Sequence, residues 1–121
     1  MKKEAWKRKI RQACEDAGTY KPYFDSVIDT LARIMERRDD AVRQFEADGG
    51  ELVVVHVNKG GAANAEKNPA YVIIRECEQD ALAYWRDLGL TPAGLRKINE
   101  QAMKEKKRDP LAEALRALGN G

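Results

Sequence analysis

The chain has few of the residues from which catalytic and metal sites are usually built. It has one histidine, His56, and two cysteines, Cys14 and Cys77, among 121 residues. The histidine lies in a run of valines, no serine or cysteine has a recognisable nucleophile context, and no carboxylate spacing indicates a metal set. We therefore expect a protein that is not an enzyme, with no catalytic residue, no metal, no cofactor and two reduced, cytosolic packing cysteines.

Long apolar segments are also missing. No run approaches the roughly 18 to 20 residues that a bilayer-spanning helix needs, and no signal peptide follows the basic N-terminus. The glycine pair in "NKGGAANAEKNP" is not followed by the Lys-Ser or Lys-Thr of a phosphate-binding loop. These absences predict a soluble chain that contacts no membrane. Its length fits one domain, near the size at which helices often need a partner to cover their apolar faces.

Most of the chain has apolar residues at helical spacing, which predicts a mainly α fold. A short helix covers 2–16 and a long one 23–48, and Asn68 and Pro69 begin another that ends near residue 88. The inner stripe of that last helix includes Leu82. Each of the two longer helices has a near-heptad seam that one charge interrupts, Arg38 in the first and Glu78 in the second. This pattern predicts a long antiparallel helical hairpin with a short β element at its tip.

Three parts are expected along the chain. Residues 1–18 form a basic N-terminal helix that is a candidate DNA contact, and residues 19–103 form the helical hairpin core, used for oligomerisation, with its β element at 51–57. Residues 104–121 form a basic hinge and a short amphipathic tail, which should order only on another surface. The tail is a candidate docking segment for a partner, or it packs within the oligomer, and its apolar residues for docking are Leu111, Leu115 and Leu118.

The β element, within "GGELVVVHVNKGG", is the most apolar part of the chain. Residues 58–61 have good hairpin-turn chemistry, but the return segment 62–65 is a poor strand former. Unpaired apolar strand edges recruit partners. We therefore predict that this strand is partly buried against neighbouring subunits rather than paired only within its own chain. The predicted oligomer interface consists of Leu52, Val53, Val54, Val55 and Val57.

Positive charge is concentrated at the two ends of the chain. Residues 1–22 hold seven basic and three acidic residues and 91–121 hold seven and four, whereas 23–57 hold four and eight. Two basic ends around an acidic middle favour an acidic partner, of which double-stranded DNA is the usual one. The predicted phosphate contacts are Lys2, Lys3, Lys7, Arg8, Lys9 and Arg11 in one group, and Arg96, Lys97, Lys104, Lys106, Lys107 and Arg108 in the other.

The segment "YWRDLGLTPAGLRKI" has the outline of a helix-turn-helix. Thr91 and Pro92 begin its second helix, with Leu95 and Ile98 on the inner face. The position four residues before the turn glycine, which is usually small where the helices cross, is Trp85. The segment is therefore either a DNA-reading unit or a plain helical corner.

The order and spacing of these motifs resemble the P27-like family of small terminase subunits from tailed bacteriophages and prophages, over about residues 20–100. The "NPAYVII" helix start and "LGLTP" are the most specific matches. The resemblance implies a non-catalytic protein of the bacterial host cytoplasm that forms rings, binds the packaging start on viral DNA, and brings in and regulates the large subunit. Two other functions stay open: a dimeric helix-turn-helix regulator, and a scaffolding protein that does not bind DNA.

Overall fold

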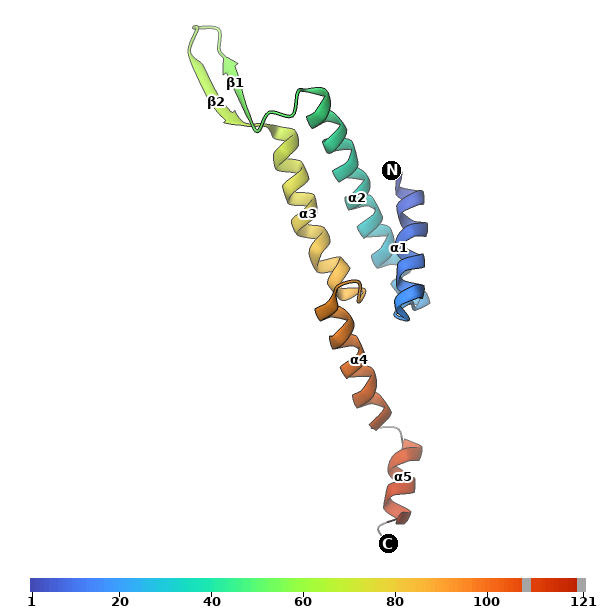
Figure 1. Ribbon diagram of the computed structural model, residues 1–121. Helices are drawn as coiled ribbons and strands as arrows, with labels where there is room; N and C mark the ends of the chain where they lie inside the picture. Colours follow the sequence, from blue (N-terminus) through green and yellow to red (C-terminus); the bar gives the residue numbers. More distant parts are fainter. Residues whose placement is uncertain (108–109, 120–121) are drawn as a thin grey trace.

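The computed structural model of the chain describes residues 1–107 and 110–119, and for residues 107 and 110–113 it describes the backbone alone. The molecule is elongated, with a β-hairpin projecting from one end of the helical body and two helices from the other (Figure 1). The predicted mainly α fold, a helical hairpin with a β element at its tip, is confirmed. In chain order the elements are α1 (Lys3–Ala17), the 3-10 turn η1 (Pro22–Phe24), α2 (Asp25–Ala47), β1 (Val53–Val57), β2 (Ala63–Lys67), α3 (Pro69–Asp87), α4 (Pro92–Lys107) and α5 (Pro110–Gly119).

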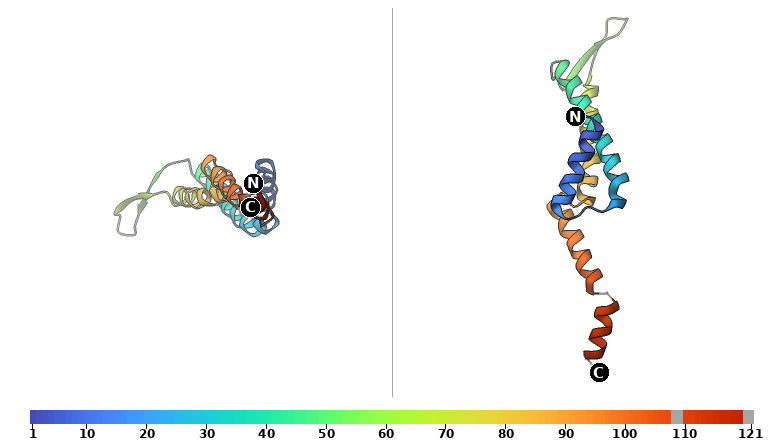
Figure 2. Two further views of the ribbon diagram at one scale, coloured as in Figure 1. Left: turned by 90° about the horizontal axis from the view of Figure 1, so that it is seen from below. Right: turned by 90° about the vertical axis from the view of Figure 1, so that its right-hand side faces the viewer.

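The core lies where α2 packs against α1 and against the antiparallel α3 (Figures 1 and 2). Trp6, Ile10 and Cys14, at helical spacing along α1, are all buried in this core. One prediction for α3 is wrong, because Leu82 is 57% exposed. Successive helical residues point about 100° apart, and Ala81 occupies the buried seam at this level. The buried core consists of Trp6, Ile10, Cys14, Ile28, Leu31, Ala32, Met35, Ala81 and Leu88.

A glycine ends α1, and the predicted Asn68 begins α3. Gly18 ends α1 with a φ of 75°, and the next N–H, that of Thr19, donates to the Cys14 carbonyl at 2.9 Å. The Asn68 side chain caps α3 by accepting the Ala70 N–H at 3.0 Å. Asn68 also donates its amide N–H to the Glu51 carbonyl at 2.9 Å. This bond fixes the chain that enters β1 to the start of α3.

The two charges that interrupt the predicted seams lie opposite each other. Arg38 Nη1 of α2 is 3.6 Å from Glu78 Oε1 of α3. A half-exposed ion pair of this kind contributes at most about 1 kcal/mol to stability. Its main effect is on the register of α2 against α3, because the two opposite charges face each other only when the helices are aligned in this way.

β1 pairs with β2 in an antiparallel hairpin within the same chain. Residues 63–65 are thus part of a returning strand although the return segment 62–65 is a poor strand former, and the predicted contact of this element with neighbouring subunits stays a prediction. The reason for the pairing lies in the turn, where the Asn58 side-chain oxygen accepts the N–H of Gly60 at 2.9 Å and that of Ala62 at 3.0 Å. The turn therefore fixes the return segment locally, whatever its intrinsic strand propensity.

The corner between α3 and α4 is closed by small residues. The buried Thr19 hydroxyl, from the joint after α1, donates to the Leu88 carbonyl at 2.7 Å. Thr91 begins α4 as predicted, since its hydroxyl oxygen accepts the Gly94 N–H at 3.1 Å. A Cβ built on Gly94 would lie 2.1 Å from the Arg86 carbonyl oxygen. The small residue at this close approach is therefore in the second helix, α4.

Gly94→Ala is expected to destabilise the protein by about 1 to 3 kcal/mol, because the added methyl group forces α4 away from α3. The midpoint of urea unfolding, followed by helical circular dichroism, measures this loss. Gly119→Ala is the matched control, since it makes the same change in α5 where a Cβ meets nothing within 4 Å. A Gly94 variant as stable as the control would contradict the close approach.

Candidate nucleic-acid interface and assembly surface

Half of the N-terminal basic group is engaged within the molecule. Lys3 Nζ and Lys7 Nζ lie 3.3 Å and 3.4 Å from the same carboxylate, that of Asp29 in α2. Arg11 Nε is 3.3 Å from Glu15 Oε1. The hydrogen bond from Lys3, against an opposing effect of desolvation, holds the pKa of Asp29 below its ordinary value. Asp29 is therefore an anion at neutral pH, and these ammonium groups are not fully available to an outside phosphate.

The other N-terminal cations are exposed. Lys2 and Arg8 make no ion pair within the described part of the chain. Lys9 Nζ lies 5.1 Å from the centroid of the Trp6 ring, which leaves the ammonium open to solvent on its outer side. Five of the six predicted residues lie on α1, and Lys2 is the N-cap residue at its start. They divide into three that form ion pairs (Lys3, Lys7 and Arg11) and three that form none (Lys2, Arg8 and Lys9) in the described part of the chain.

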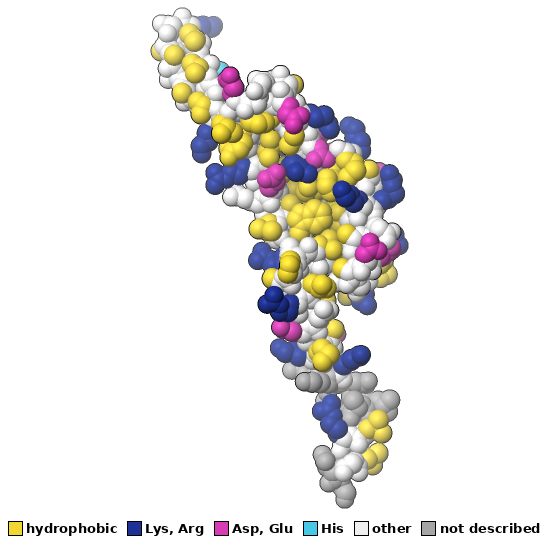
Figure 3. Space-filling view, viewed as in Figure 1, with side chains coloured by type: hydrophobic (Ala, Val, Ile, Leu, Met, Phe, Trp, Pro, Cys, Tyr) yellow, Lys and Arg dark blue, Asp and Glu magenta, His cyan; other side chains and the backbone are white. Residues whose placement is uncertain are grey.

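The second basic group is open throughout its described part. Four exposed cations of α4, none of which forms an ion pair in the residues described, are Arg96, Lys97, Lys104 and Lys106. Lys97 and Lys104 point in similar directions because they are seven residues apart, and Arg96 points about 80° to 100° from both. The side chain of Lys107 and all of Arg108 lie outside the described residues. Figure 3 shows basic side chains spaced along this half of the molecule.

The corner adds a cation that sequence patterns did not single out. Arg86, at the end of α3, lines a shallow hollow together with Lys97 and Gln101 of α4. Arg86 lies outside both basic segments that charge counting located, and only the approach of α4 to α3 brings it beside the basic group.

The helix-turn-helix interpretation fits the corner poorly. α4 continues away from the body in roughly the direction of α3 rather than crossing back over it (Figures 1 and 2). Trp85 packs on Trp6 of α1, with ring centroids 6.5 Å apart. It is not the small residue that a helix crossing needs at this position. The described geometry is that of a plain helical corner that extends a basic helix.

The two faces of the β-hairpin differ in polarity. Alternation and register put three valines of β1 and two alanines of β2 on one face, and the valines are more than half exposed. The opposite face has a 2.6 Å contact between His56 Nε2 and Glu66 Oε1. The apolar face consists of Val53, Val55, Val57, Ala63 and Ala65. We call these five residues the valine face.

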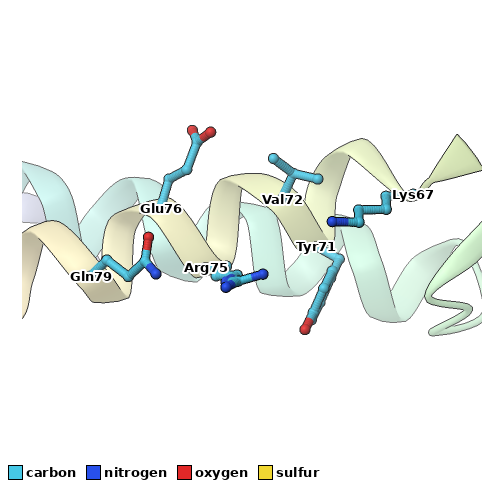
Figure 4. A pocket seen from close by; sticks show the side chains of 6 residues that line it. All are labelled: Lys67, Tyr71, Val72, Arg75, Glu76 and Gln79. Carbon is cyan, nitrogen blue, oxygen red and sulfur yellow. The ribbon is translucent and has the colours of Figure 1, made fainter.

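The valine face leads toward a shallow hollow at the start of α3. Lys67, opposite Val53 in the register, lines this hollow with Tyr71 and Arg75 (Figure 4). Neither cation has an ion-pair partner in the described residues. An apolar face bordered by two open cations has the composition of a protein interface with a charged rim. Leu52, also predicted for this interface, is exposed, whereas Val54 is half-buried on the other face.

The predicted docking residues on α5 are partly described. Leu115 and Leu118 are 61% and 78% exposed, and α5 lies beyond the end of α4 (Figure 1). The side chain of Leu111 lies outside the described residues. A helix whose leucines face solvent has an unburied apolar side, so its structure here is compatible with docking on a partner.

Metal-binding clusters and membrane-spanning helices are both missing from residues 1–107 and 110–119. In these ranges no group of three or more His, Cys, Asp or Glu residues could hold a metal ion, and no helix is long and apolar enough to cross a bilayer.

A family model described as "Phage terminase, small subunit" matches residues 3–105, from the start of α1 into the last turn of α4. No curated protein and no solved structure matches the chain significantly.

Proposed function

Because the chain belongs to the family of phage terminase small subunits, we propose that it binds viral double-stranded DNA at the packaging start, assembles as a ring, and brings in and regulates the terminase large subunit. The observation that carries the proposal is the family match over residues 3–105, which confirms the resemblance inferred from the motifs. The protein works in the bacterial host cytoplasm without a catalytic centre, since ATP hydrolysis and DNA cleavage belong to the large subunit.

The exposed cations support DNA binding. The four open cations of α4 and the open N-terminal ones, Lys2, Arg8 and Lys9, are available to phosphates without breaking an ion pair of the described structure. Phosphate contacts position a protein on DNA without selecting sequence. Repeating weak contacts around an oligomer raises the total affinity by multivalency. A ring can therefore hold DNA firmly although each subunit holds it weakly.

The valine face supports assembly. Monomeric proteins rarely leave a contiguous apolar β surface exposed, since such surfaces pair with other chains. The hairpin projects from the helical body (Figure 1), so a neighbouring subunit can cover it. The exposed leucines of α5, at the other end of the molecule, leave a separate apolar surface for the large subunit.

The proposal predicts a salt-dependent DNA complex of a large oligomer. If four phosphates are contacted, the affinity for a labelled duplex should fall about a hundredfold between 50 mM and 200 mM salt, as measured by fluorescence anisotropy. Light scattering should give a mass several times that of the 13.6 kDa chain. A dimer that prefers palindromic DNA would instead favour the regulator, and an oligomer with no DNA affinity would favour the scaffolding protein.

A further inference from the structure

Asp29 occupies the centre of the N-terminal basic group. Besides Lys3 and Lys7, its carboxylate is 3.8 Å from Arg33 Nη2. Glu4 also reaches Lys7, at a longer 3.9 Å. One carboxylate thus forms ion pairs with three cations. Two of them, Lys3 and Lys7, come from α1, the helix that is predicted to contact phosphate. The side chains of Asp29, Lys3 and Lys7 are each about one-third exposed, so an outside anion can reach the same ammonium groups.

The same surface is concave. Lys7, Arg8 and Arg11 line a shallow hollow between α1 and the start of α2, with Ile28 beneath them. The rim of the hollow also carries the carboxylates of Glu4 and Asp25. Three cations around one hollow match the negative charge and the several acceptor oxygens of a nucleic-acid phosphate.

The packing of α1 against α2 does not depend on Asp29. Trp6, Ile10 and Cys14 bury one side of α1 in the core. The Lys3 backbone N–H donates to Glu36 at 2.6 Å, and the Trp6 indole N–H donates to Asp39 at 2.7 Å. The half-exposed ion pairs of Asp29 therefore add little to what already fixes the helix. Their larger effect is on the charge that the hollow presents.

We propose that Asp29 limits the affinity of the N-terminal basic group for DNA, because its carboxylate and a nucleic-acid phosphate compete for the ammonium groups of Lys3 and Lys7. This inference rests on the proposed DNA-binding function and names an affinity-determining residue for it. A phosphate that binds the ammonium groups of Lys3 and Lys7, of which Lys7 also lines the hollow, takes these lysines from Asp29 and leaves the carboxylate with Arg33. The negative charge of Asp29, which Lys3 and Lys7 then no longer neutralise, repels the bound DNA strand. The competition keeps the contact of each subunit weak and reversible.

Asp29→Asn tests this competition, because it keeps the size of the side chain and removes its charge. The matched control is Asp80→Asn, which removes the same charge from an exposed position of α3 that makes no ion pair within the described residues. We expect Asp29→Asn to bind a labelled DNA duplex about fivefold or more tightly than the control variant at low salt. If each of the two lysines then binds a phosphate, the slope of log affinity against log salt should steepen by about two.

A third variant separates competition from a general effect of charge. Adding Lys3→Gln and Lys7→Gln to Asp29→Asn should abolish the increase in affinity, while helical circular dichroism stays unchanged. Equal affinities of Asp29→Asn and Asp80→Asn, with the wild type binding DNA, would overturn this inference alone. A wild type and an Asp29 variant that both fail to bind DNA would overturn the proposed function as well. Weaker binding by Asp29→Asn would show that Asp29 positions the lysines rather than competing for them.

Discussion

Val53→Asp combined with Val55→Asp is expected to reduce the proposed large oligomer to smaller species. Both valines lie on the valine face and are more than half exposed in the single chain. Burying a valine in an interface contributes about 1.5 kcal/mol, so two valines account for about two decades in the association constant of each contact. Carboxylates in their place would also have to be desolvated without a partner. Size-exclusion chromatography with light scattering measures the change.

The opposite face of the hairpin provides the matched control. Val55→Asp and Asn64→Asp each add one negative charge to the hairpin, but on opposite faces. Only the first should lower the oligomer mass. Both should keep the helical circular dichroism of the wild type, because the valine face contributes nothing to the buried core. An equal fall in mass in both variants would indicate a general effect of charge and contradict the valine face as the contact surface.

Arg96→Glu combined with Lys97→Glu is expected to weaken DNA binding about a hundredfold at low salt. In each subunit two of the proposed phosphate contacts are replaced by two anions that repel phosphate, and the effect is repeated around the proposed oligomer. The salt dependence should become shallower, by about 0.9 in the slope for each phosphate that is no longer bound. The helix itself should persist, because glutamate is a good helix former and neither cation forms an ion pair in the described structure. Fluorescence anisotropy over a salt series provides both quantities.

A control with the same change in charge is available on α2. Arg37→Glu with Arg43→Glu reverses two exposed cations outside both proposed DNA groups, and of these Arg43 pairs with the nearby Asp40. The affinity of this variant should fall only a few-fold. An equal fall in both double variants would mean that net charge, and not the exposed side of α4, governs the interaction with DNA.

Local signals in the sequence predicted the elements and their ends. Helical periodicity depends only on residues a few positions apart. The same holds for the cap that the Asn68 side chain provides and for the left-handed Gly18 that ends α1. The two interrupted seams predicted the antiparallel helical hairpin, whose Arg38 and Glu78 meet in the structure. The order of short motifs also predicted the family, which the match over residues 3–105 confirms.

The candidate surfaces were predicted in part. Charge counting located both basic groups, and the apolar run located the hairpin, because composition is a property of each segment alone. Composition could not show that β2 pairs with β1, or that this pairing makes one face of the hairpin polar and leaves the valine face exposed. The fate of a side chain depends on which face of its element a neighbour covers, as the exposure of Leu82 demonstrates.

The sequence by itself thus determined the helices, their ends and the charged segments, because each follows from residues close together in the chain. It also determined the family, through the order and spacing of its short motifs. Only the tertiary structure decided that Asp29 engages Lys3 and Lys7, that Arg86 joins the basic group of α4, and that Gly94 makes the close crossing at the corner. These facts depend on distances between different elements, such as α1 and α2. Those distances are set by how buried faces pack together, and no local pattern specifies them.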